Sequence, residues 1–305
     1  SEPAAAKPQR TQTETAPRID RRRSAPAMLW RSVLALICAA ACANAEPALT
    51  LDGVTPLPRL SDSFGGLSAI EVSDGGATAV VLSDRGGLFH LTLDRSGDTL
   101  AVTDATPDDR TAHLGDTEGM AVDAKGRLYI SLEGPAGVMA ERADGSFERV
   151  KPHPDFAGMV QNRALEALAV AADGTLVTMP EASHANTAPF PVYQYKDGTW
   201  TKGPALPRKG SFLITGADFG PDGWLYVLER AVSLRGFASR VRRFDLTAPD
   251  LSETTLLTTD AGTYGNLEGL SVWQDDTGTT HLSLVADDNF NIFQSNQIVE
   301  FTLTE

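Results

Sequence analysis

The residues of this sequence that could do chemistry are mostly acidic, and they recur at fixed places in a repeated pattern. Five segments share one design: a polar opening, an alternating apolar strand, a glycine turn, and a second strand that ends in an acid. The acids that end the second strands are Asp84, Glu133, Glu181, Glu229 and Asp287. Three openings also carry an acid, namely Glu118, Glu166 and Glu268. Oxygen ligands from several segments suit a hard cation such as Ca²⁺ better than zinc.

These carboxylates are expected to meet at one rim of the fold. In an antiparallel hairpin the start of the first strand lies beside the end of the second, which brings both sets of acids together. Carboxylates crowded in this way repel one another unless they share a cation or a proton. We therefore expect a Ca²⁺ site with ligands drawn from Glu118, Glu166, Glu268, Asp84 and Asp287. The structural alternative is that each acid accepts backbone N–H groups from the neighbouring segment and holds the fold together.

Further residues beside these acids are candidates for substrate binding and proton transfer. Arg85 follows Asp84 and Arg230 follows Glu229, so either guanidinium could hold an anionic group through two parallel hydrogen bonds. An ion pair with the neighbouring acid is the alternative for both arginines. The candidates for accepting the proton of an attacking water are Glu133, Glu181 and His184. A position on a surface loop is the alternative for His184.

The spacing of the repeated segments predicts the fold. Their opening residues follow one another at intervals of 50, 48, 49 and 53 residues, and they are Ser68, Glu118, Glu166, Thr215 and Glu268. A period near 50 with several short strands per repeat is typical of an all-β propeller with one four-stranded blade per repeat. We expect five blades, or six if residues 135–160 contain a degenerate repeat. A β-sandwich also has short strands, but it would not return one motif five times.

The two ends of the repeated region are expected to close the ring. Few residues follow the last repeat, so a strand within residues 48–60 would pair with one at residues 298–303. Residues 46–305 then form a single propeller domain.

The N-terminal region has a different character. Residues 1–27 lack apolar periodicity, so we expect them to be disordered, or an upstream artefact if Met28 is the initiator. Residues 28–45 contain a basic residue, a short apolar run and the small-x-small sequence Ala43-Asn44-Ala45, which together predict a signal peptide cleaved near Ala45. The mature protein would be periplasmic or secreted. Both cysteines, Cys38 and Cys42, would leave with the signal peptide.

The charge of the chain excludes several partners. The whole sequence has a net charge of −14, and residues 1–45 hold seven Lys or Arg and three Asp or Glu, so the remainder carries about −18. A surface this acidic does not suit nucleic acid, because phosphate binding needs basic patches. The apolar run before Ala45 is also too short for a membrane span. We expect a monomer without a membrane span in its mature form.

Several strings in the repeats resemble a known family. They are Asp116-Thr117-Glu118-Gly119-Met120-Ala121, Ala164-Leu165-Glu166-Ala167-Leu168-Ala169, Asn266-Leu267-Glu268-Gly269-Leu270, Leu284-Val285-Ala286-Asp287-Asp288-Asn289-Phe290 and Gln297-Ile298-Val299-Glu300-Phe301. Together they are similar to the exported phytase-like propellers described as having esterase-like activity, over about residues 60–304.

The resemblance implies roles for particular residues. The Asp-Asp-Asn-Phe segment is its most specific part, so Asp288 and Asn289 are assigned to substrate binding. Similar Glu-Gly openings supply calcium ligands in gluconolactonase-type propellers, which implies the same role for Glu118, Glu166 and Glu268. The first and fourth repeats depart from this pattern because they carry Ser68 and Thr215.

The resulting hypothesis is an exported, metal-dependent hydrolase of phosphate or carboxylic esters that acts on a small anionic substrate. The cation would polarise the ester, and arginine would steady the anion. The alternatives are a non-catalytic propeller that binds a ligand or partner at the same mouth, and a lactonase of the gluconolactonase type.

Overall fold

The structure is a computed structural model that describes residues 46–57, 61, 64–97, 99–159, 163–183, 187–290 and 294–305. The expected disordered segment 1–27, the signal peptide 28–45 and the cleavage near Ala45 lie outside the described residues, as does His184. In the part of the chain that the structure describes, no helix combines the length and the apolar character that crossing a membrane requires.

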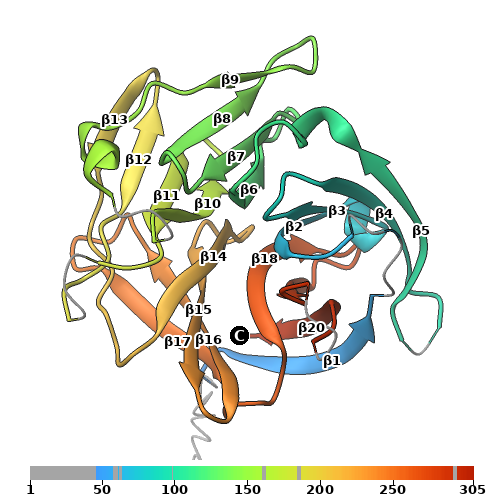
Figure 1. Ribbon diagram of the computed structural model, residues 1–305. Helices are drawn as coiled ribbons and strands as arrows, with labels where there is room; N and C mark the ends of the chain where they lie inside the picture. Colours follow the sequence, from blue (N-terminus) through green and yellow to red (C-terminus); the bar gives the residue numbers. More distant parts are fainter. Residues whose placement is uncertain are drawn as a thin grey trace, which may run out of the picture. The chain divides into compact units, whose positions relative to one another are not determined.

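Five four-stranded antiparallel sheets stand in a ring and form a five-bladed β-propeller (Figure 1). Blade 1 contains β2 (Leu67–Ser73), β3 (Thr78–Ser83), β4 (Leu88–Asp94) and β5 (Ala101–Asp108). Blade 2 contains β6 (Thr117–Val122), β7 (Leu128–Leu132), β8 (Gly137–Glu141) and β9 (Phe147–Arg149). Blade 3 contains β10 (Leu165–Val170), β11 (Leu176–Pro180), β12 (Tyr193–Lys196) and β13 (Thr199–Lys202). Blade 4 contains β14 (Leu213–Phe219), β15 (Leu225–Ser233), β16 (Gly236–Asp245) and β17 (Ser252–Thr258).

Blade 5 joins the two ends of the propeller. It contains β18 (Asn266–Gln274), β19 (Thr280–Asp287), β20 (Gln297–Thr304) and, as its outermost strand, β1 (Ala48–Pro56). Among the described residues, three short 3₁₀ helices lie in connections: η1 (Asp74–Gly76), η2 (Asp109–Thr111) and η3 (Pro154–Gly158). The five-blade prediction and the closing strand pair are confirmed. The six-blade alternative is wrong, because residues 135–160 supply the outer half of blade 2 and η3.

The core lies between the blades. Five buried apolar clusters are each shared by two adjacent blades. In one of them, Ala169 and Val177 of blade 3 share a cluster with Leu225 and Val227 of blade 4. Burying a Val or Leu side chain contributes about 1.5–3 kcal/mol. The alternating apolar strands therefore stabilise the ring mainly through contacts from blade to blade.

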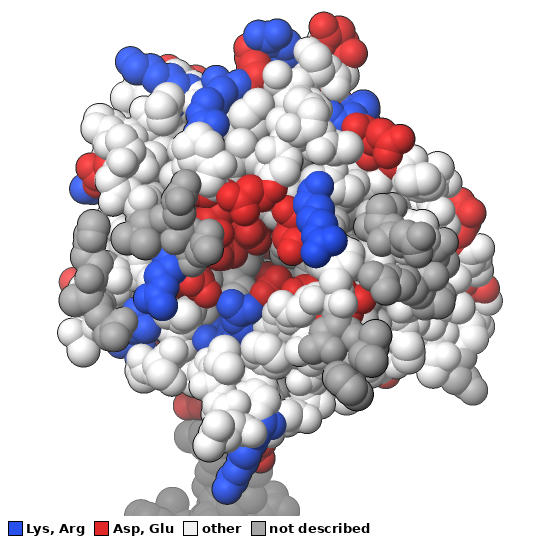
Figure 2. Space-filling model, in the orientation of Figure 1, with Lys and Arg blue, Asp and Glu red and all other residues white. Residues whose placement is uncertain are grey.

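Each innermost strand has a β-bulge at its opening. The pairing with the second strand shifts register there in all five blades, at Ser68, Glu118, Glu166, Thr215 and Glu268. A bulge leaves its extra residue unpaired in the ladder and re-aims the side chain. The three glutamates converge on the centre of the ring, where Figure 2 shows a hollow lined by acidic side chains.

Glycine follows two of these glutamates because adjacent inner strands approach closely. A Cβ atom at Gly119 would lie 2.5 Å from the carbonyl oxygen of Glu166, and one at Gly269 would lie 2.7 Å from the Cα atom of Ala69. Real Cβ atoms do not approach backbone so closely. The Glu-Gly opening therefore combines a ligand-like side chain with a packing requirement of the ring.

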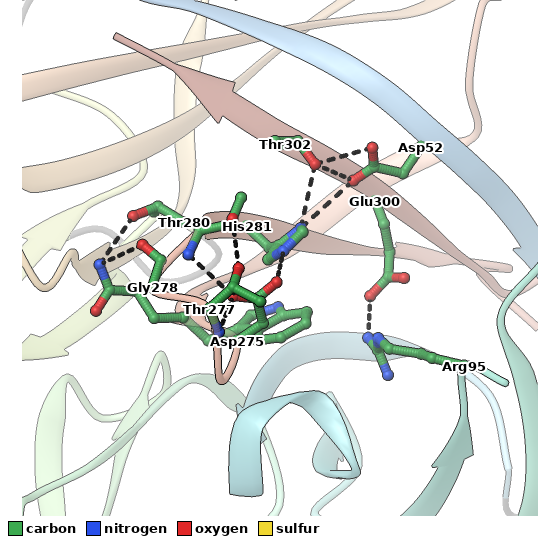
Figure 3. Close-up of polar contacts among 12 residues, drawn as sticks. Asp52, Arg95, Asp275, Thr277, Gly278, Thr280, His281, Glu300 and Thr302 are labelled. Carbon is green, nitrogen blue, oxygen red and sulfur yellow. Dashed lines mark hydrogen bonds and ion pairs between the residues drawn. The ribbon is translucent and has the colours of Figure 1, made fainter.

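Polar contacts hold β1 in blade 5 (Figure 3). The Thr302 hydroxyl on β20 lies 2.8 and 2.9 Å from the two carboxylate oxygens of Asp52 on β1, and 3.2 Å from Nδ1 of His281 on β19. Nε2 of His281 lies 3.3 Å from Asp275. Arg95, which directly follows β4 of blade 1, forms an ion pair with Glu300 of blade 5. These contacts reinforce the ring where its first and last strands meet.

Candidate functional site

The candidate site is the acidic mouth of the central channel, where strand ends of different blades are joined by backbone hydrogen bonds. The N–H of Thr117 donates to the carbonyl of Asp84 (3.0 Å), and that of Ile214 donates to the carbonyl of Glu181 (3.2 Å). Within blade 2, the N–H of Glu133 donates to the carbonyl of Asp116 (3.1 Å). Lysine and arginine side chains lie around the hollow in Figure 2, while its lining is largely acidic.

Three carboxylates of blade 2 form what we call the acidic cluster. One oxygen each from Asp116, Glu118 and Glu133 lies within 4.8 Å of the other two. Asp116 precedes β6 with a positive φ of 47°, Glu118 is the bulge residue of β6, and Glu133 directly follows β7. The geometry allows one hard cation to contact all three side chains.

Asp116 was not among the predicted ligands. The equivalent positions in the third and fifth repeats, two residues before the glutamate, are Ala164 and Asn266. The repeat pattern therefore does not identify Asp116 as a ligand, because an aspartate occurs at this position in only one of these three repeats. The available signal was local, namely two acids spaced two apart at a strand opening.

The electrostatics of the mouth favour the uptake of a cation or protons. Burial, and then the charges of Glu268 and Glu133, raise the pKa of Glu118 well above its usual range. Burial and the charge of Glu118 do the same to the pKa of Glu166. Burial also raises the pKa of Glu133, against hydrogen bonds from the N–H of Ala164 and from Glu166. Among the described residues, no Lys or Arg forms an ion pair with the acidic cluster or Glu166.

Arg230 balances the charge on the opposite side of the mouth. Its guanidinium reaches from β15 to Asn266 (2.7 Å), to Glu268, and to Glu181 (3.1 Å). Burial raises the pKa of Glu268, and the charge of Arg230 opposes the shift. Arg230 thus holds both Glu268, which was expected as a metal ligand, and Glu181, which was expected as a base.

Two further expected metal ligands flank the mouth near Glu268. Burial raises the pKa of Asp84, and the charge of the neighbouring Arg85 opposes this shift. Burial and the charge of Glu268 raise the pKa of Asp287 to about 7. The Asp287 carboxylate also accepts the N–H of Asn289 (2.7 Å).

Asp288 and Asn289 lie in the turn that follows β19. The Asp288 carboxylate accepts the N–H groups of Gly66 (3.1 Å) and Phe290 (2.9 Å), so it ties this turn to blade 1. Asn289 is exposed, and its amide donates to Gln294 (2.7 Å). Asp288 therefore shapes the rim, whereas Asn289 faces solvent.

Arg85 differs from Arg230 in having its charge available. It is exposed, its guanidinium lies 3.5 Å from the ring centroid of Phe290, and it forms no ion pair with the described residues. Stacking on an aromatic ring orients a guanidinium while leaving its N–H groups for an anion. Of the two predicted anion-binding arginines, Arg85 is the unpaired one.

Glu229 does not contribute to the mouth, contrary to the sequence pattern. Its side chain is fully buried, and its carboxylate binds Arg240 (2.6 Å) and Arg242 (2.8 Å) on β16. The strand β15 continues four residues beyond it, to Ser233. The fourth repeat thus uses its acid to pair two buried arginines within one blade.

Three other residues carry the backbone-holding role proposed as the alternative for the glutamates that open inner strands. Glu71 accepts the N–H of Val122, Asp218 accepts that of Val272 (2.6 Å), and the Ser271 hydroxyl accepts that of Val72 (2.9 Å). Each acceptor lies three residues after a bulge residue and binds the next blade. Among the described residues, no N–H or O–H group donates to Glu118, which separates it from this structural set.

The comparisons with known proteins give one assignment. No curated protein matches the sequence. A gluconolactonase from Xanthomonas campestris is 15% identical with a TM-score of 0.45, over 84% of this chain and 95% of that one. Virginiamycin B lyase from Staphylococcus aureus is 14% identical with a TM-score of 0.40, over 79% of this chain and 71% of that one. Residues 62–290 match the family described as "Phytase-like: Esterase-like activity of phytase", and the chain belongs to that family.

Proposed function

We propose that this protein is a metal-dependent hydrolase of phosphate or carboxylic esters that acts at the mouth of the propeller channel. The observation that carries the proposal is the acidic cluster, whose three carboxylates converge without an ion pair to any Lys or Arg that the structure describes. Its membership of a family with esterase-like activity supports the reaction class.

The donor set fits a hard divalent cation such as Ca²⁺. Asp116, Glu118 and Glu133 offer oxygen atoms only, and no hydrogen-bond donor among the described residues occupies Glu118. A bound divalent cation would polarise an ester oxygen and lower the pKa of a water molecule. It would also reverse the negative field that otherwise repels an anionic substrate.

The surrounding side chains have distinct roles in this proposal. Arg85, held on Phe290, binds the anionic oxygen of the substrate. Glu166 lies beside Glu133, and burial and the charge of Glu118 raise its pKa, so in its ionised form it is the base that accepts the proton of the attacking water. Arg230 keeps Glu181 and Glu268 in place and limits the number of unpaired charges at the mouth.

The proposal is tested by turnover of chromogenic phosphate and acyl esters with Ca²⁺, Mg²⁺ or Mn²⁺ and with chelator. We expect activity that chelation abolishes and that Glu118→Gln lowers by at least 100-fold, because one ligand charge is lost. Glu148→Gln on the outer surface is the matched control. Specific ligand capture without turnover would replace the hydrolase with a binding propeller, and turnover of lactones alone would replace it with a lactonase.

We further propose that the protein acts outside the cytoplasm. The apolar run before Ala43-Asn44-Ala45 supports export and cleavage near Ala45. N-terminal sequencing of the exported protein is expected to begin at Glu46. Finding residues 1–27 on that protein would contradict the proposal.

A further inference from the structure

A cavity of ≈510 Å³ lies beside the acidic cluster, between the β7–β8 loop and the β9–β10 connection that contains η3. Small-molecule sites commonly measure about 300–1,000 Å³. Its apolar walls include Pro135, Ala136, Pro152, Phe156, Ala157 and Met159. The polar side chains that line it are Glu133, Arg149 and His153. The lining is therefore apolar, with few hydrogen-bonding groups.

The walls of the cavity are held in place by their own contacts. Nη2 of Arg149 donates to the carbonyl oxygens of Pro135 and Ala136, both at 2.8 Å. Phe156 packs edge-to-face on Tyr193 and Trp200, with centroid distances of 5.1 and 5.2 Å. Nδ1 of His153 accepts the N–H of Asp155 (3.1 Å) at the start of η3. The cavity is thus preformed, which lowers the entropic cost of binding.

Glu133 connects the cavity to the candidate site. Its carboxylate belongs to the acidic cluster, and the same residue lines the cavity. The side chain is fixed from blade 3, since its Oε1 accepts the N–H of Ala164 (3.3 Å). A molecule in the cavity therefore lies next to the place where the ester group would be cleaved.

Resting on the proposed function, we propose that this cavity binds the alcohol portion of the ester, and that this portion is a flat apolar group such as a phenol. The phosphoryl or acyl carbonyl oxygens need the charged mouth, which leaves the carbon skeleton for the apolar walls. In a phosphate monoester the carbon skeleton is entirely on the alcohol side, and for a carboxylic ester the comparison of a phenyl with a methyl ester tests the same assignment.

The chemistry of the walls favours an aromatic alcohol over a polyol. Aromatic and proline faces pack well against a flat ring. A polyol would bring many hydroxyl groups into a cavity with three polar side chains, and buried hydroxyl groups without a hydrogen-bond partner weaken binding. We therefore expect aryl esters to be preferred over esters of sugars or inositol.

The test fills the cavity from its exposed edge with Ala157→Phe, using Ala124→Phe, at an exposed turn outside the cavity, as the matched control. For phenyl and methyl esters of the same acid, we expect Ala157→Phe to lower kcat/KM at least 10-fold for the phenyl ester, mainly through KM. The methyl ester and the control variant should change less than 2-fold. Equal losses for both esters, or no loss, would overturn the assignment.

A binding measurement separates this inference from the proposed function. Calorimetric titration with 1-naphthol should show binding to the wild-type protein and to Ala124→Phe, and at least 10-fold weaker binding to Ala157→Phe. If no ester is hydrolysed but this pattern appears, the hydrolase proposal fails and the cavity stands. Absent binding, or binding that Ala157→Phe does not weaken, overturns the cavity assignment. Unfolding midpoints of both variants within a few degrees of the wild type show that the fold is retained.

Discussion

At the scale of single residues, the mouth of the propeller is divided by one arginine. Arg230 pairs with Glu181 and Glu268, so its charge offsets part of the negative charge on that side in the folded chain. Neither of these ion pairs involves a carboxylate of the acidic cluster. Like charges held together in this way raise the free energy of the folded state unless a cation or proton is bound. The apo protein is therefore expected to gain stability from a divalent cation.

The first prediction concerns this gain in stability. Calcium at 100 times its Kd should stabilise the fold by about 2.7 kcal/mol and raise the unfolding midpoint by about 5–10 °C. Glu118→Gln should reduce this shift by more than half, since it removes one ligand charge. Thermal melts of both proteins, with calcium and with chelator, measure the effect. Glu148→Gln should behave like the wild type, and a wild-type midpoint that calcium does not move ends the metal hypothesis.

At the residue scale, the sequence predicts some residues of the candidate site but not others. Glu118 and Glu166 were predicted because they recur with the repeat. Asp116 occurs in one repeat, and the reach of Arg230 to two other blades depends on side-chain geometry that spacing does not encode. The cavity next to Glu133 is built by a connection between blades that does not repeat. The periodicity of the sequence thus predicts the residues that recur in the blades. The candidate site also depends on residues and a connection that occur in one blade only.

At the scale of elements, the bulged opening of each inner strand positions the carboxylates. The bulge re-aims the side chain, and in three of the blades a glycine after it (Gly119, Gly216 or Gly269) lets the next blade approach. The fold and the mouth therefore depend on the same few backbone positions. Hairpin alternation and the turn glycines were readable from the sequence. The bulges were not, because each lies within the first three residues of its strand, where too few residues precede it to show a shift in the alternation.

The second prediction tests the close approach of the inner strands. Gly119→Ala would place a Cβ 2.5 Å from the carbonyl oxygen of Glu166 and 2.7 Å from the nitrogen of Leu168. Overpacking against backbone should lower the free energy of unfolding by about 1–3 kcal/mol. It should also weaken calcium binding, because β10 carries Glu166. Urea unfolding measures the loss, and Gly158→Ala, with nothing within 4 Å of its Cβ, should change stability by less than about 0.5 kcal/mol.

The third prediction concerns the attachment of β1. Thr302→Val keeps the shape of the side chain but removes the hydroxyl that donates to Asp52. Losing this contact should cost about 1–2 kcal/mol and speed hydrogen exchange of the β1 amides before those of other blades. Thr304→Val on the same strand is the control, since its hydroxyl bonds to none of the described residues. Unchanged exchange in β1 would contradict the role given to Thr302.

At the scale of the whole molecule, buried carboxyl groups make stability depend on pH. Burial raises the pKa of Asp218, on the innermost strand of blade 4, to about 7. Burial and the charge of Asp218 also raise the pKa of Glu71, which faces it. A carboxyl whose folded pKa is raised binds its proton more tightly in the folded state, so stability falls as pH rises from its unfolded pKa to its folded pKa.

The fourth prediction follows from this sign. In chelator, the free energy of unfolding should decrease between about pH 4 and 7, by on the order of 4 kcal/mol if Asp218 shifts from 3.8 to about 7. Below pH 4 other carboxyls with lowered pKa, such as Asp108, oppose the trend. Asp218→Asn should flatten the slope between pH 5 and 8 while lowering stability at pH 5. Urea unfolding at each pH measures both proteins, and an equally steep slope in the variant would contradict the assignment to Asp218.

The pairing of β1 with β20 also determines the order in which parts of the protein can fold during its synthesis. Ala48 is opposite Thr304, so the earliest strand of the described chain waits for the last one before it gains a partner. Blades 1 to 4 are built from neighbouring strands and can assemble as the ribosome delivers them. Until residue 304 emerges, β1 is an unpaired edge that includes the exposed Leu51 and Val54. If synthesis stalls within blade 5, the nascent chain therefore has an unpaired β1 edge that can pair with other chains, and its ring of blades is not closed.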